Sequence, residues 1–178
     1  MRTTVASADI GIQGPAYTTG TGGSPTTSKP ESKLWFNDGF WWAVMAKRVS
    51  ATNNDYHIFR LRLRSQRWVD TGVVVDGRDS TRQDVLSTGS KLFVASHKYV
   101  PTTSNTVPGA NDEMRLLRFS YNAATNRYAS SPDGVATIDP EKSETLVIDR
   151  DSTGALWATW VQADGSGHHV YVKRTNGN

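Results

Sequence analysis

The chain has 178 residues, of which 37% are hydrophobic and 21% charged, and its formal net charge is +3. This length suits a single domain with a core of ordinary size. The lack of cysteine excludes a disulfide framework and thiolate chemistry, and the lack of a long apolar run argues against a transmembrane helix.

The first 31 residues are expected to form a short N-terminal strand followed by a linker. The opening stretch, "MRTTVASADIGIQG", lacks the apolar centre of a signal peptide. Residues 14–31, "GPAYTTGTGGSPTTSKPE", consist largely of Gly, Ser, Thr and Pro and offer almost nothing to bury. We therefore place the packed domain in residues 32–178.

Short apolar runs separated by turn residues follow, and no long window shows the 3.6-residue period of a helix. Asp38-Gly39 between two apolar runs is a strong hairpin signal. Ser65-Gln66 marks another turn. These signals predict four successive antiparallel strands, at 33–37, 40–48, 56–64 and 67–76.

The same plan then recurs, which predicts strands at 84–88, 91–100, 114–122 and 127–139, and again at 144–148, 155–162 and 168–174. Aligning the hairpins places Trp42, Phe93 and Trp157 at one position. Four strands in a repeat of roughly 40–60 residues are typical of a β-propeller blade.

The repeats therefore predict an all-β fold, a partial β-propeller of four-stranded antiparallel blades. The blades are expected at about 32–76, 84–139 and, incomplete, 144–178. A ring needs at least about four blades. The chain is then a fragment, or it closes a ring by self-association, or its N-terminal segment completes a blade.

One turn of the third hairpin, Asp149-x-Asp151-x-Thr153-Gly154, resembles the first half of a calcium loop. The bidentate acid that such a loop needs at its twelfth position is replaced by Trp160. The aligned turns of the other hairpins carry no acid pair. We therefore interpret this stretch as a β-turn held by Asx hydrogen bonds, and we expect no metal and no cofactor.

From about residue 29 to residue 174 the chain resembles secreted bacterial β-propeller domains of sialidase-like type. The resemblance is carried by "KPESKLWFNDGFWWAVM", "DYHIFRLRLRSQRWVDTGVVVDGRDSTRQDVL", "GSKLFVASHKY" and "KSETLVIDRDSTGALWATWVQ". It implies a propeller in an extracellular protein. "DRDSTGALW" matches a sialidase Asp box only loosely, and the arginine triad, Tyr–Glu pair and acid of sialidases have no counterpart. Enzymatic activity is therefore left open.

Ligands of propellers meet the end of the channel where the innermost strands begin. The loops that lead into the first strand of each group are 26–33, 76–84 and 139–144. These loops are expected to bring charged side chains to one rim. The charged side chains at aligned positions are Lys33, Asp84 and Glu144, and nearby lie Asp76, Arg78, Asp79, Arg82, Glu141 and Lys142.

Asp84 and Glu144 are the candidate catalytic residues, because neighbouring carboxylates could act as acid and base on a glycosidic bond. Arg78 and Arg82 could hold the carboxylate of an acidic sugar. The alternative is that these acids and arginines pair with one another and fix one blade to the next.

Aromatic and histidine residues supply weaker candidates. Trp41 and Trp42 face opposite ways along a strand, so one belongs to the core and the other, taken here as Trp41, could stack on a sugar. His97 is expected to be structural. His168 and His169 point to opposite faces of a strand and cannot easily share a metal.

These observations favour a ligand-binding propeller module, with carbohydrate as the expected ligand. Two alternatives stay open: a sialidase-like glycoside hydrolase whose site needs further blades, and a structural or protein-interaction propeller. The expected partners are a glycan or acidic sugar and further blades or copies of the chain. Neither nucleic acid nor membrane is expected, because the arginines of "HIFRLRLRSQRW" alternate with apolar residues, as on the solvated face of a strand.

Overall fold

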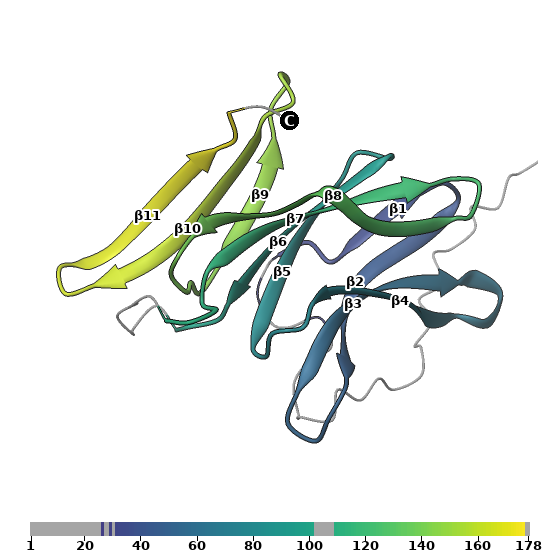
Figure 1. The fold of residues 1–178 in the computed structure, drawn as a ribbon, viewed down its shortest axis with the longest axis horizontal. Helices are drawn as coiled ribbons and strands as arrows, with labels where there is room; N and C mark the ends of the chain where they lie inside the picture. The colour runs from purple at the N-terminus through teal and green to yellow at the C-terminus, as the bar shows by residue number, and fades with distance from the viewer. Residues whose placement is uncertain (1–25, 27–28, 30, 102–108, 177–178) are drawn as a thin grey trace, which may run out of the picture.

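The computed structural model describes residues 26, 29, 31–101 and 109–176. In this part of the chain three antiparallel sheets stand in a row, with the second between the first and the third (Figure 1). The predicted N-terminal strand lies outside the described residues. No helix among the described residues is long and apolar enough to cross a membrane.

The first sheet is a four-stranded meander. Its strands are β1 (Leu34–Asn37), β2 (Phe40–Arg48), β3 (Asn54–Arg62) and β4 (Arg67–Asp76). The turn between β1 and β2 has positive φ at Asp38 and Gly39, 51° and 77°. A two-residue hairpin turn of this hand needs such angles, which explains the Asp-Gly pair. A one-turn 3-10 helix, Leu63–Ser65, replaces part of the predicted third strand.

The second sheet repeats this plan, and the third follows it for three strands. The second contains β5 (Thr81–Ser87), β6 (Lys91–Lys98), β7 (Met114–Asn122) and β8 (Arg127–Asp139). The third contains β9 (Leu146–Arg150), β10 (Leu156–Asp164) and β11 (Gly167–Arg174). The prediction of an all-β fold built of antiparallel sheets is confirmed. The three sheets do not close a ring within the described residues.

The hairpin register defines equivalent positions in the three sheets. Trp42 pairs with Trp35, Phe93 with Leu86, and Trp157 with Asp149. Trp42 is buried against the second sheet and Phe93 against the third. These side chains therefore point toward the sheet that follows their own.

Two hydrophobic cores lie between the sheets. The core between the first and second sheets contains Trp42, Val44, Ile58, Leu92 and Phe119 among others. The core between the second and third sheets includes Phe93, Met114, Leu146, Leu156 and Trp160. Since each strand presents alternate residues to its two faces, the second sheet supplies both cores.

Candidate functional site

The first strands of the three sheets lie side by side, with β5 between β1 and β9. Residues 31–33, which precede β1, connect the first two sheets. The carbonyl of Lys33 accepts the amide of Val44 at 3.0 Å, and that of Ser32 accepts the amide of Val85 at 3.1 Å. The predicted rim residues lie around this connection.

Asp84 joins all three sheets through its carboxylate. One oxygen accepts the backbone amide of Ser32 at 2.6 Å, and the other accepts the amide of Ile148, in β9, at 2.8 Å. The side chain is buried. Burial raises the pKa of Asp84 despite these two amide hydrogen bonds. Both oxygens thus serve the packing of neighbouring sheets, as the structural alternative expects.

Glu144 does not occupy the position equivalent to Asp84. Asp84 pairs with Ala95, and in the third hairpin the equivalent pair is Val147 with Thr159. The sequence alignment was wrong here because it counted residues 149–154 as the turn, whereas Asp149 and Arg150 belong to β9 and pair with Trp157 and Leu156. Glu144 lies three residues before this position and forms an ion pair with Lys29.

A buried group of charges surrounds Lys33. Its ammonium donates to the carbonyl of Gln83 and lies 3.5 Å from Glu31 Oε2. Glu31 Oε1 lies 3.3 Å from His97 Nε2, and His97 Nδ1 lies 3.0 Å from the carbonyl of Ser143. Both ring nitrogens of His97 therefore face hydrogen-bond acceptors within the protein.

The pKa values in this group reflect burial and charge. Burial alone would raise the pKa of Glu31, but the hydrogen bond with His97 and the charges of Lys33 and Arg82 outweigh it, so the pKa lies below its ordinary value. Burial lowers the pKa of Lys33, and the carboxylates of Glu31 and Asp84 offset part of that effect. The charges of Glu31 and Lys33 thus stabilise each other, as in a buried network of ion pairs.

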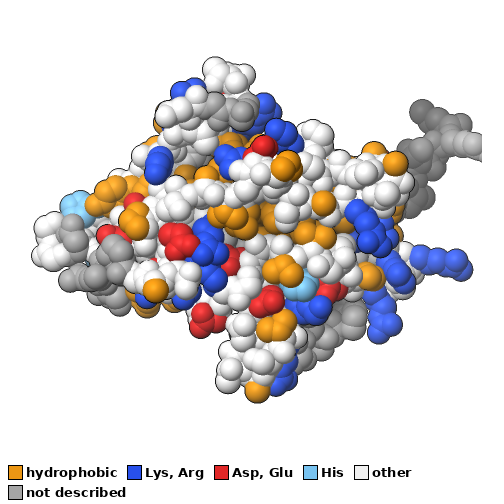
Figure 2. All heavy atoms as spheres, viewed as in Figure 1, with side chains coloured by type: hydrophobic (Ala, Val, Ile, Leu, Met, Phe, Trp, Pro, Cys, Tyr) orange, Lys and Arg blue, Asp and Glu red, His pale blue; other side chains and the backbone are white. Residues whose placement is uncertain are grey.

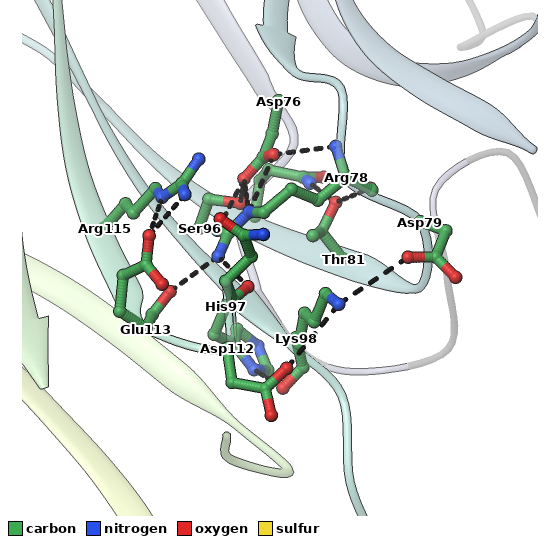
Figure 3. A network of polar contacts seen from close by, with 12 residues as sticks. Asp76, Arg78, Asp79, Thr81, Ser96, His97, Lys98, Asp112, Glu113 and Arg115 are labelled. Carbon is green, nitrogen blue, oxygen red and sulfur yellow. Dashed lines mark hydrogen bonds and ion pairs between the residues drawn. The ribbon is translucent and has the colours of Figure 1, made fainter. Parts of the chain in front are cut away.

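The two arginines proposed to hold a ligand carboxylate have different partners in the structure. The guanidinium of Arg82 stacks on the ring of Tyr99, 3.5 Å from its centroid. Arg78 binds both carboxylate oxygens of Asp76, as Figure 3 shows, and its Nη1 donates to the carbonyls of Asn111 and Glu113. Arg78 therefore fixes the chain before β7 and is not available to a ligand.

The rest of the network in Figure 3 is also internally paired. Ser96 donates to Asp76 at 2.6 Å. Lys98 lies between Asp79 and Asp112, 3.7 Å and 3.5 Å from their carboxylates. Outside the labelled residues of the figure, Lys142 lies 2.9 Å from Asp112. These charges hold together the loops between strands.

A cleft that the sequence did not indicate opens between the second and third sheets. Its volume is about 300 Å³, within the range of small-ligand sites. Aliphatic side chains form much of its lining, and no acidic residue lines it among the described residues. The lining includes Leu116, Ile138, Ile148, Leu156 and Ala158, together with the cations Arg118, Lys173 and Arg174.

The three cations of this inter-sheet cleft differ in their partners. Lys173 donates to the carbonyl of Ile138 at 2.7 Å. Arg174 lies 3.4 Å from the carboxylate of Asp151 and over the ring of Trp157. Within the described part of the chain, the guanidinium of Arg118 has no hydrogen-bond or ion-pair partner. The cleft thus contains an arginine, Arg118, without a counterion, together with aliphatic side chains.

No protein-family model, curated protein or solved structure matches this chain. The candidate site is therefore assigned from the geometry of the structure alone. Sequence periodicity could not indicate the inter-sheet cleft, because Arg118 alternates with apolar residues as any solvated strand residue does. Glu31 was assigned to the linker. Its one local signal is the alternation with Lys33 directly before β1.

The acidic turn of the third hairpin is held by Asp151. Its Oδ1 accepts the amide of Thr153 at 2.9 Å and the amide of Ala155 at 3.0 Å, and its Oδ2 accepts the indole N–H of Trp157 at 2.8 Å. The hydrogen bond from Thr153 is the Asx hydrogen bond that the sequence predicted. Among the described residues, no group of three His, Cys, Asp or Glu side chains is placed to hold a metal.

Replacement of Asp151 by alanine is expected to lower the melting temperature most at neutral pH. Hydrogen bonds from the hydroxyl of Thr153 and the indole of Trp157 hold the pKa of Asp151 well below its ordinary value. The stabilisation is therefore complete above the ordinary value, about pH 4, and is lost as the pH falls toward the lower folded value. Melting curves of wild type and variant should converge in acid.

Asp149→Ala is the matched control, because that carboxylate accepts the amide of the next residue, Arg150. Its melting temperature should differ little from wild type at either pH. A constant difference between Asp151→Ala and wild type across the acid range would contradict the role of the ionised carboxylate.

The remaining candidates fall on the surface or in the core. Trp42 is fully buried, and Trp41 is exposed, as their alternation predicted. His97 is fully buried and structural in its contacts. His168 and His169 are exposed neighbours on β11, and Nε2 of His169 contacts the hydroxyl of Ser166 at 3.0 Å.

Proposed function

We propose that the chain is a non-catalytic binding module whose ligand is a saccharide bearing a carboxylate. The observation that carries this proposal is the unpaired guanidinium of Arg118 in the inter-sheet cleft. An arginine beside aliphatic side chains favours a ligand that has a carboxylate and a less polar remainder. Lys173 and Arg174 add positive charge at the same cleft.

We also propose a β-propeller architecture and an extracellular location for the protein. The three sheets are taken as successive blades of a β-propeller, which is supported by their shared strand order and by the contact of β1 with β5 and of β5 with β9. The resemblance to secreted propeller domains favours an extracellular protein. Acidic saccharides occur outside cells, on cell surfaces and in polymers.

The hydrolase alternative receives less support from the geometry. A catalytic acid or base must be free to exchange a proton with its substrate. Both oxygens of Asp84 accept backbone amides, and Glu144 is paired with Lys29. We therefore place the ligand in the inter-sheet cleft and give the rim carboxylates a structural role.

Replacement of Arg118 by glutamine is expected to weaken binding of an acidic oligosaccharide by about ten- to a hundredfold. A hydrogen bond to a charged group contributes roughly 1.5–3 kcal/mol, which corresponds to this loss of affinity. Titration calorimetry with a uronic-acid oligosaccharide and its neutral analogue measures the effect. The wild-type chain should prefer the acidic ligand, and the variant should lose that preference.

Arg127→Gln is the matched control, because Arg127 is an exposed arginine at the start of β8 in the same sheet. It should bind as wild type does. Circular dichroism of each variant shows whether the fold is retained. Equal affinity of wild type and Arg118→Gln, or equal affinity of wild type for the acidic and neutral ligands, would contradict the proposal.

A further inference from the structure

Arginines cluster at the turn between β3 and β4. Residues 60–67, "RLRLRSQR", contain four arginines and no acidic residue. Arg62 ends β3, Arg64 lies in the one-turn helix and Arg67 begins β4, and all three side chains are exposed. In Figure 1 this turn lies at the end of the molecule opposite β11. Figure 2 shows Lys and Arg side chains gathered at that end, on the right.

The strand register places two of these arginines directly opposite each other. Arg62 pairs with Arg67 across the antiparallel strands. Paired residues in such a ladder are about 4.5–5.5 Å apart at Cα, and their side chains project from the same face of the sheet. Like charges at directly opposite positions destabilise a sheet. The packing of the fold therefore does not explain why both positions are arginine.

The cluster has no anion from the protein itself. Within the described part of the chain, the guanidiniums of Arg62, Arg64 and Arg67 have no hydrogen-bond or ion-pair partner. The guanidinium of Arg60, the fourth arginine, lies over the ring of Phe40, 4.9 Å from its centroid. An anion from outside the protein would reduce the repulsion within this cluster.

Hydrogen bonds within the turn fix its backbone. Gln66 has a left-handed conformation, with a φ of 51°. Its backbone amide donates to the carbonyl of Leu63 at 3.3 Å, and its side-chain amide donates to the same carbonyl at 2.7 Å. The arginines are therefore carried by an ordered turn, which lowers the entropy lost when they bind a partner.

We propose that the arginine turn, residues 60–67, binds successive anionic groups of a linear acidic polysaccharide. A guanidinium forms paired hydrogen bonds with a carboxylate or a sulfate. Alternate residues of a strand are about 6.5 Å apart and paired residues about 5 Å. The turn thus fits anions that recur along a polymer. The saccharide nature of the partner rests on the function proposed above, whereas the anion-binding surface does not.

The surroundings of the arginine turn favour a saccharide over a nucleic acid or a membrane. Single-stranded nucleic acid stacks its bases on aromatic rings among the cations. Trp68 pairs with Leu61 and packs on the outer face of the first sheet, which is the face turned away from the second sheet and from these arginines. A membrane surface also receives apolar side chains, and of residues 60–67 only Leu63 is an exposed large hydrophobic residue.

Titration of the chain with galacturonate and with an oligogalacturonate of about ten residues tests this proposal. The oligomer should bind more tightly than the monomer, and added salt should remove most of the gain because exposed charges are screened. Arg62→Gln/Arg67→Gln should weaken binding of the oligomer about five- to tenfold at low salt and leave binding of the monomer unchanged. Arg118→Gln should weaken binding of the monomer and keep the salt-dependent gain of the oligomer.

Lys91→Gln/Arg127→Gln is the matched control, because it removes two positive charges from exposed positions of the second sheet. It should bind the oligomer as wild type does. Arg62→Lys/Arg67→Lys keeps the charge without the planar fork and should give an intermediate affinity. Circular dichroism shows whether each variant is folded.

The outcomes separate this proposal from that for Arg118. A wild-type chain that binds the oligomer but not the monomer would contradict the role of Arg118 and support the arginine turn. Equal affinity of wild type and Arg62→Gln/Arg67→Gln for the oligomer, or an equal loss in the control, would overturn the arginine turn as a binding surface. Tighter binding of single-stranded DNA or of phosphatidylglycerol vesicles, lost in the same variant, would overturn the polysaccharide as its partner.

Discussion

Replacement of Trp42 by alanine is expected to destabilise the chain by about 3–5 kcal/mol, as truncation of a buried tryptophan usually does. Trp42 is fully buried between the first and second sheets. Its ring meets those of Tyr128 and Tyr121 edge to face, with centroids 5.0 Å and 5.9 Å apart, and its indole N–H donates to the carbonyl of Asn37 at 3.1 Å. Denaturant unfolding measures the loss.

The neighbouring Trp41 provides the matched control. It has the same side chain on the same strand but points to the outer face of the first sheet. In dilute solution, Trp41→Ala should cost much less than Trp42→Ala, because little apolar surface is removed from the core. Similar losses for the two variants would mean that the first sheet does not pack on the second as described.

Replacement of Asp84 by alanine is expected to cost about 3 kcal/mol. The change leaves the amides of Ser32 and Ile148 without their acceptors at a site closed to solvent. An unsatisfied buried donor costs roughly 1–3 kcal/mol, and removal of a buried charge returns part of the sum. Thermal and denaturant unfolding should both register the loss.

Asp84→Asn separates a structural role from a catalytic one. The amide keeps one oxygen acceptor but turns an N–H₂ donor toward the second backbone amide, so we expect an intermediate loss of stability. A catalytic carboxylate that has no structural role would show no such loss. Stable Asp84→Ala and Asp84→Asn variants would therefore refute the assignment of Asp84 to sheet packing.

Local sequence predicted the strands well, because hairpin turns and alternation are local properties. Asp38-Gly39 specifies its turn through positive φ angles, and the strands on either side begin and end close to the predicted residues. The alternation of Trp41 and Trp42 also assigned one side chain to the surface and one to the core. These features need no knowledge of which sheet packs on which.

The candidate site was harder to predict, because it depends on contacts between sheets. The two backbone amides that donate to Asp84 come from residues 52 and 64 positions away. Glu144 was aligned with Asp84 because residues 149–154 were taken as the turn, whereas Asp149 and Arg150 pair within the sheet. Arg118 gives no sequence signal at all, since its importance comes from the absence of a counterion in a cleft formed by two sheets.

The order of contacts along this chain also bears on how the molecule opens. Each sheet is made from one continuous stretch of sequence, and among the described residues the second sheet alone packs against another sheet on both faces. Stability in such an array is roughly a sum of nearest-neighbour terms. Every residue of β11 is exposed, so the third sheet is the end from which local unfolding starts, while the first two sheets keep their shared core.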